Sequence, residues 1–264
     1  MKTFPSLFVC ALMSMSAGAA DTQLSATELA ARMNSMQQDG TSFIRLRMEI
    51  QQPPGNAQST LQVQIKQRRT KSATEVVYQI LWPKDRAGEA VLLRKTDRQG
   101  ASGSLLSPPD TLRQLGAAQM RETLFGSSLS YADVVENFFA WEHQTLVGTE
   151  TMQRAQCLIL ESKPGRSDSS IYTSVRSWVD ARRLVPLRVE KYVSSGRLAR
   201  RIDTTRVVFN DGHHLPASMM VYDTQKNSAT EFDGSNIKRS VNFDASTFTP
   251  EGLKQAAPPG SKSD

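Results

Sequence analysis

The stretch TSFIRLRMEIQQ (residues 41–52), followed by PPGN (53–56) and STLQVQIKQRR (59–69), alternates apolar and polar side chains almost without fault. Period-two alternation is typical of β-strands that have one apolar face and one solvated face. The Pro-Pro-Gly-Asn run predicts a hairpin turn between the two strands. The side chains expected on the shared apolar face are Ile44, Leu46, Met48 and Ile50 in the first strand, with Leu61, Val63 and Ile65 in the second.

Two other segments have helical spacing. SATELAARMNSMQQ (25–38), with Ser25 or Thr27 as the cap, and SYADVVENFFAW (130–141), with Ser130 as the cap, each continue with an apolar stripe. The remaining short alternating runs bring the prediction to about ten or eleven strands, and their short separators favour an antiparallel meander over βαβ units. Residues 104–120, broken by Pro108-Pro109, predict an irregular connection. The other runs that we expect to be strands cover 74–82, 89–97, 143–150, 155–163, 170–180, 184–193, 197–209, 214–223 and 228–237.

The N-terminus predicts an export signal. Lys2 supplies a positive start, Phe4 to Met15 an apolar core, and Ala17-Gly18-Ala19 a cleavage site of small residues. The apolar run is shorter than the about 20 residues that span a bilayer. We therefore expect residues 1–20 to be a signal peptide that is cleaved near Ala19 or Ala20, and the protein to reach the periplasm.

The mature chain has the length of one domain. About 200 to 250 residues is usual for a single all-β barrel or sandwich, and no repeat or linker divides residues 21–254. The tail from 255 to 264 is predicted to be disordered. Cys157, the one cysteine that remains after cleavage, lies in an apolar strand, so we expect a buried and unreactive thiol.

The chain carries a formal net charge of +6. A basic protein attracts anionic membranes or nucleic acids over long distances. Export argues against nucleic acid, and the basic residues are scattered, so a solvated surface is the simpler interpretation and a surface that faces anionic envelope lipids is the alternative.

Motifs for catalysis and for metal or nucleotide binding are missing. The sequence has three histidines but no HExxH, no CxxC, no GxSxG, and neither of the glycine-rich phosphate motifs. We therefore expect no metal, no cofactor and no enzymatic activity. A glycosidase-type carboxylate pair is the remaining alternative, although Glu161, Asp180 and Glu190 are predicted to face solvent.

The apolar inventory allows two interpretations. Trp82, Trp141, Trp178, Tyr78 and the Phe138-Phe139 pair bury large areas wherever they lie. One interpretation is an ordinary filled core beneath two helices. The other is a cavity, because two helices are few for so many one-sided strands, and a strongly curved sheet closed by a small lid fits these proportions.

Several motifs together resemble the LolA-like family of outer-membrane lipoprotein-sorting proteins. The resemblance covers nearly all of residues 25–254 and is carried by motifs that shape the fold. These motifs are ATELAARMNSMQQDGTSFIRLRMEIQ (26–51), Trp82-Pro83-Lys84-Asp85, LFGSSLSYADVVENF (124–138), SVRSWVDARRLVPLRVEKYVSSGRLARRI (174–202) and VNFDASTFTPEGL (241–253).

The resemblance implies a mainly β (α+β) fold in which a single curved antiparallel sheet forms an incomplete β-barrel closed by two or three lid helices. It also implies a monomeric periplasmic carrier of lipid or lipoprotein acyl chains, with an inner-membrane transporter or an outer-membrane receptor as further partners. The alternative function is a non-catalytic accessory protein of an envelope transporter. The residues expected to line the lipid-binding cavity are Ile44, Leu46, Met48, Leu61, Val63, Ile65, Tyr78, Ile80, Trp82, Phe138 and Phe139.

Overall fold

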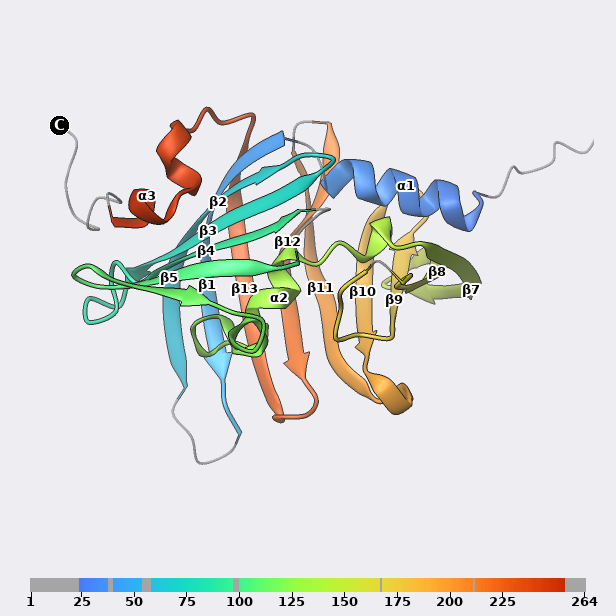
Figure 1. Ribbon diagram of the computed structural model, residues 1–264. Coiled ribbons are helices and arrows are strands. Elements are labelled where there is room, and N and C mark those ends of the chain that lie inside the picture. The colour runs from blue at the N-terminus through green and yellow to red at the C-terminus, as the bar shows by residue number, and fades with distance from the viewer. Residues whose placement is uncertain are drawn as a thin grey trace, which may run out of the picture.

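The computed structural model describes residues 24–37, 40–53, 58–96, 100–166, 168–210 and 212–254. The predicted signal peptide, its cleavage positions Ala19 and Ala20, most of the turn at 53–56 and the tail from 255 lie outside the described residues. The described chain forms one antiparallel sheet of 13 strands, with its helices on the two faces (Figure 1).

The strands follow the chain as β1 (Gly40–Gln51), β2 (Ser59–Arg69), β3 (Ala73–Trp82), β4 (Ala90–Thr96), β5 (Ser102–Ser107), β6 (Thr111–Leu115), β7 (His143–Met152), β8 (Ala155–Lys163), β9 (Ser174–Asp180), β10 (Val185–Tyr192), β11 (Leu198–Asn210), β12 (His213–Asp223) and β13 (Ser228–Arg239). The helices are α1 (Ala26–Gln37), α2 (Tyr131–Val135) and α3 (Pro250–Lys254), with short 3₁₀ turns η1 (Gln119–Arg121), η2 (Leu124–Gly126), η3 (Phe138–Ala140), η4 (Ser194–Gly196) and η5 (Ala245–Phe248).

The sheet consists of two meanders that meet at its centre. Its strand order is β6-β5-β4-β3-β2-β1-β13-β12-β11-β10-β9-β8-β7, so that the first and last strands are neighbours. Strands β6 and β7 are therefore the two edges, and the sheet does not close into a barrel. The chain between them, residues 116–142, has to travel from one edge of the sheet to the other. We call it the crossing segment; it includes α2 and passes over one face of the sheet in Figure 1.

The predicted fold class and most of the predicted elements are confirmed. Strand β1 pairs with β2, with Ile44 opposite Ile65 and Met48 opposite Leu61, so that the apolar side chains share one face as predicted. Helix α1 begins after Ser25, whose hydroxyl accepts a hydrogen bond from the Glu28 amide at 3.2 Å. The sheet has 13 strands, more than the ten or eleven predicted. The two extra strands, β5 and β6, form a short hairpin around Pro108-Pro109, where the exposed polar side chains of β6 conceal the alternation.

The prediction of one continuous helix over 130–141 is wrong, because the observed helix is much shorter. A capping box between Ser130 and Asp133 starts α2, but Glu136 has an extended backbone (φ −69°, ψ 132°) and only a 3₁₀ turn follows. The reason lies in the two cores that the segment serves. Val135 packs into one of them, whereas Phe138 and Phe139 pack into the other, so the chain extends between them instead of continuing as a helix.

These two cores cover different parts of one face of the sheet, which we call the inner face. The first lies over β1 to β4 beneath the crossing segment, where Leu61, Val63 and Ile80 form one cluster with Tyr131 and Val135. The second lies beneath α1 and η3, over β8 to β10, and includes Leu29, Met33 and the two phenylalanines. Ile202 of β11 packs against both clusters, which places them on the same face.

The third helix is not part of the lid. Phe248 of η5 and Leu253 of α3 pack against Val77, Leu92 and Leu106. Successive side chains of a strand point to opposite faces, and Val76 and Leu93 belong to the inner core. Helix α3 therefore covers the outer face, at the upper left of Figure 1. The lid consists of α1 and the crossing segment alone.

Candidate functional site

A cavity of about 390 Å³ lies on the inner face at the centre of the sheet, between the two filled cores. Its floor comes from β1, β2 and β10 to β13, and its roof from α1 and the crossing segment. The lining residues are Met36, Gln37, Ser42, Ile44, Gln67, Arg69, Asp133, Val134, Glu136, Phe138, Phe139, Pro186, Val189, Lys191, Ile202, Thr204, Leu215, Pro216, Met219, Ile237 and Arg239.

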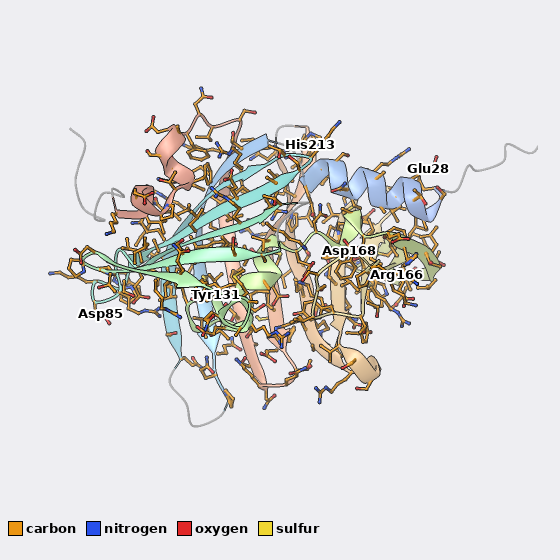
Figure 2. All side chains as sticks on the ribbon, in the orientation of Figure 1. Glu28, Asp85, Tyr131, Arg166, Asp168 and His213 are labelled. Carbon is orange, nitrogen blue, oxygen red and sulfur yellow. The ribbon has the colours of Figure 1, made fainter. Side chains whose placement is uncertain are left out.

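Part of the cavity wall lies near one end of the sheet. Leu215 and Pro216 lie two and three residues after His213, which Figure 2 labels at the end of the sheet beside α1. The C-terminal end of α1 contributes Met36 and Gln37, and the end of β13 contributes Arg239. Figure 2 also labels Tyr131 on α2, at the filled core.

The predicted cavity residues lie in three different environments. Ile44, Phe138 and Phe139 line the cavity. Trp82 lies at the end of β3 and is 49% exposed. The remaining predicted residues belong to the core beneath the crossing segment, either buried in it or packed against it: Leu46, Met48, Leu61, Val63, Ile65, Tyr78 and Ile80.

Sequence reasoning missed most of the C-terminal half of the cavity. Val189, Ile202, Met219 and Ile237 come from β10 to β13, strands whose inner faces were not assigned. One signal could have found them. In VPLRVEKY, Val189 and Lys191 are both buried and line the cavity, and the second is a lysine in place of an apolar residue, whereas Val185 and Leu187 are buried in a different cluster.

That lysine belongs to a cluster of buried ions at the cavity wall. The side chains of Lys191 and Asp133 are 2% and 0% exposed, and the Lys191 ammonium lies 2.6 Å from Asp133 Oδ1. The Tyr172 hydroxyl donates a hydrogen bond to the same oxygen at 2.8 Å. Arg200 Nε lies 3.8 Å from Asp133 Oδ2, and Arg200 Nη1 lies 2.9 Å from Asp223 Oδ1. The cluster connects α2 to β10, β11 and β12.

The electrostatics of this cluster keep Asp133 charged. Burial alone would raise the pKa of Asp133, but Lys191, Arg200 and the hydrogen bonds from Lys191 and Ser130 outweigh it and lower the pKa from 3.8 to about 2. The pKa of Tyr172 is raised by burial and by the neighbouring Asp133 carboxylate. Asp133 is therefore a fixed anion that holds the crossing segment against the sheet.

Two further polar contacts hold the crossing segment. Lys95 Nζ donates to Glu136 Oε1 at 3.0 Å, and Arg69 Nη2 donates to the carbonyl oxygen of Val134 at 3.2 Å. Burial lowers the pKa of Arg69. The lid is thus held by polar side chains at its middle and by apolar contacts on both sides.

The described residues offer no site for a metal ion. No group of three or more histidine, cysteine or acidic side chains in that part of the chain could hold a metal ion. Cys157 is buried, as predicted. Glu161 and Asp180 are buried, which corrects the prediction that they face solvent, and each is paired with a basic side chain. The helices within the described ranges are all too short or too polar to cross a membrane.

The comparisons with known proteins agree with this architecture. A family model with the description "-like: Uncharacterized protein" matches residues 35–255. No curated protein matches the chain. A DUF1329 family protein from Desulfovibrio piger has 22% identity and a TM-score of 0.79, with 86% of this chain and 97% of that chain covered.

Two other solved structures are similar. A putative outer membrane lipoprotein-sorting protein domain from Vibrio parahaemolyticus has 19% identity and a TM-score of 0.76, with 87% of this chain and 98% of that chain covered. A LolA superfamily protein from Nitrosomonas europaea has 20% identity and a TM-score of 0.67, with coverage of 86% and 98%. These likenesses confirm the LolA-like fold predicted from the sequence.

Proposed function

The chain belongs to the family whose model matches residues 35–255, and from this membership and its LolA-like fold we propose that it is a periplasmic carrier of acyl chains. The domain over residues 21–254 would hold one or more chains of a lipid or lipoprotein in the cavity between the lid and the sheet. Its role would be transport between the membranes of the envelope, without catalysis.

The observation that supports this function most is the cavity itself. Its volume of about 390 Å³ lies within the range of about 300–1,000 Å³ that is common for ligand sites. The side chains around it are mostly apolar, and those from the lid include Met36, Phe138 and Phe139. Each methylene that leaves water for such a site contributes about 0.8 kcal/mol, so a long chain binds without a charged anchor.

The proposed site keeps three of the residues predicted from the sequence, Ile44, Phe138 and Phe139. To these it adds Ile202 and Met219 from the strands on the other side of the central β1–β13 pair. The apolar residues of β2 and β3 support the floor from the filled core and do not line the cavity.

Two adjacent methionines of β12 provide the test. Met219 lines the cavity, whereas Met220 points to the other face and pairs with Asp203 and Glu231. We expect Met219→Trp to reduce the uptake of a fluorescent fatty-acid probe by about tenfold or more, because the indole fills space that the chain needs. Met220→Trp introduces the same side chain outside the cavity and should bind the probe like the unsubstituted protein.

Mass spectrometry of organic extracts from the purified protein tests the cargo directly. Lipid that co-purifies reproducibly, and that Met219→Trp removes, supports the carrier. Equal probe binding by both variants, together with empty protein, would contradict it. Empty protein in a stable complex with an envelope transporter would favour the accessory alternative.

A further inference from the structure

A second cavity, which we call the basic groove, lies at the other end of the same strands. Its volume is about 400 Å³, and it is lined by the end of β10, the start of β11, the turn between β12 and β13, η1 and the chain before β9. Asp223 ends β12 at this groove, whereas His213 begins β12 at the opposite end of the sheet, as Figure 2 shows. The turn η4 marks the groove end of the sheet in Figure 1.

The lining of the basic groove is unusually positive. Four of its residues are cations, Arg121, Arg197, Arg200 and Lys226, and Asp223 is the one carboxylate. That carboxylate already pairs with Arg200 at 2.9 Å. Arg121, Arg197 and Lys226 are exposed, and none of them takes part in an ion pair with another described residue. Three uncompensated cations around one hollow attract an anion.

Two residues that line the groove carry buried polar atoms without a hydrogen-bond partner. Arg200 is 8% exposed and Asp223 is 1% exposed. Arg200 Nε and Asp223 Oδ2 are both buried, and neither has a hydrogen-bond partner among the described residues. Buried polar atoms without partners are uncommon and are costly when nothing satisfies them. Arg200 Nε lies 3.8 Å from Asp133 Oδ2 and so faces the ion cluster, whereas Asp223 Oδ2 is an acceptor that a donor group of a ligand would satisfy.

We propose that the basic groove binds a phosphate group. Arginine recognises phosphate oxygens through its planar set of N–H donors, and lysine does so as a point charge. The negative charge of a bound phosphate would be balanced by the positive charges of Arg121, Arg197 and Lys226. Asp223 Oδ2 would accept a hydrogen bond from a protonated phosphate oxygen or from a neighbouring hydroxyl of the ligand.

This inference does not depend on the acyl-chain cavity. The ion cluster of Lys191, Asp133 and Arg200 lies between the two: Lys191 and Asp133 line the apolar cavity, whereas Arg200 lines the groove. The phosphate could belong to a phospholipid headgroup or to a small soluble phosphate. Both sources share the same chemistry, and the binding experiment below separates them.

The groove variant that we suggest is Arg197→Gln with Lys226→Gln, because both side chains are exposed and neither supports the core. The matched control is Lys71→Gln with Lys84→Gln, which removes two exposed cations outside the groove. The control therefore has the same net charge as the groove variant. The ligands are inorganic phosphate, dihexanoylphosphatidylglycerol and dihexanoylphosphatidylcholine. Binding is measured by calorimetry at constant ionic strength, with chloride as the reference anion.

We expect phosphate to bind the unsubstituted protein and the control alike, and to bind the groove variant about tenfold more weakly or worse, since charge-assisted contacts are lost. A preference for the anionic lipid over the zwitterionic one, lost in the groove variant, identifies a headgroup. Binding of inorganic phosphate without that preference identifies a soluble phosphate.

Equal phosphate affinity in the groove variant and the control, or no binding beyond that of chloride, would overturn the proposal. Uptake of the fatty-acid probe serves as a separate readout. It should be the same in the groove variant, so that a failure of the phosphate site and a failure of the carrier function are distinguishable.

Discussion

The two ends of strand β1 differ although both carry apolar side chains toward the inner face. Near Ile44 the strand lines the cavity, whereas near Met48, four residues later, it belongs to a core from which water is excluded. The difference comes from what lies above the strand. Tyr131 and Val135 of α2 belong to the same filled cluster as Met48, whereas Ile44 lines the cavity together with Glu136, where the backbone is extended.

This comparison shows that an apolar strand face does not itself specify a site. The same alternating pattern supports a filled core where α2 of the crossing segment packs on the sheet. It supports a cavity where the crossing segment continues from α2 toward α1. The boundary between the two regions is the ion cluster at Asp133. The predictions below test whether the ion cluster separates a filled core from a cavity.

The largest effect is expected from removing the charge at the boundary. Asp133→Asn leaves the buried Lys191 without its counter-ion, and breaking a buried pair in this way costs about 3–5 kcal/mol of unfolding free energy. Asp233→Asn is the control, because Asp233 pairs with Arg206 at the surface and such pairs contribute about 0–1 kcal/mol. Urea denaturation measures both. Similar losses in the two variants would mean that the cluster does not hold the lid.

The filled core and the cavity should respond differently to truncation. Leu61→Ala removes a fully buried side chain from the core and should cost about 2–5 kcal/mol. Met219→Ala, at the partly exposed cavity wall, should cost less than about 1 kcal/mol because space is already present around it. A loss for Met219→Ala that equals the loss for Leu61→Ala would show that the central region is filled as well.

Acid should weaken the ion cluster at Asp133. The pKa of Asp133 is lowered to about 2 in the folded protein, below its value in the unfolded chain. Its contribution is therefore present above about pH 4 and is lost as the pH falls toward 2, by an amount on the order of 2 kcal/mol. Unfolding curves between pH 5 and pH 2 should show this component in the unsubstituted protein and lack it in Asp133→Asn.

A smaller effect is expected at Leu46, between the two regions. Its side chain packs against the filled core, and Gly234 lies directly beside it on β13. Leu46→Trp should therefore overpack this position and cost about 1–3 kcal/mol, with unchanged uptake of the fatty-acid probe. Reduced probe uptake with an unchanged melting temperature would instead place Leu46 in the cavity, as predicted from the sequence.

The sequence predicted the fold well because alternation is a local property. The β1–β2 hairpin and its inward face follow from residues 41–69 alone. The cavity depends on which distant segments meet, and period-two patterns carry no information on that. Ile202 and Met219 carry the same pattern as core residues, and only the path of the crossing segment distinguishes them. Lys191, a charged residue at a buried position of β10, is the local exception that could have pointed to the cluster.

The pairing of β1 with β13 also has a consequence for how the molecule is made. These strands are neighbours in space and lie nearly at opposite ends of the described chain. Their pairing, which we call the seam, therefore forms only after almost the whole polypeptide is present. Long-range pairings of this kind slow folding. The cavity lies over the seam, with Ile44 on one side and Ile237 on the other. A chain that stops before β13 would keep both meanders but never assemble the binding site.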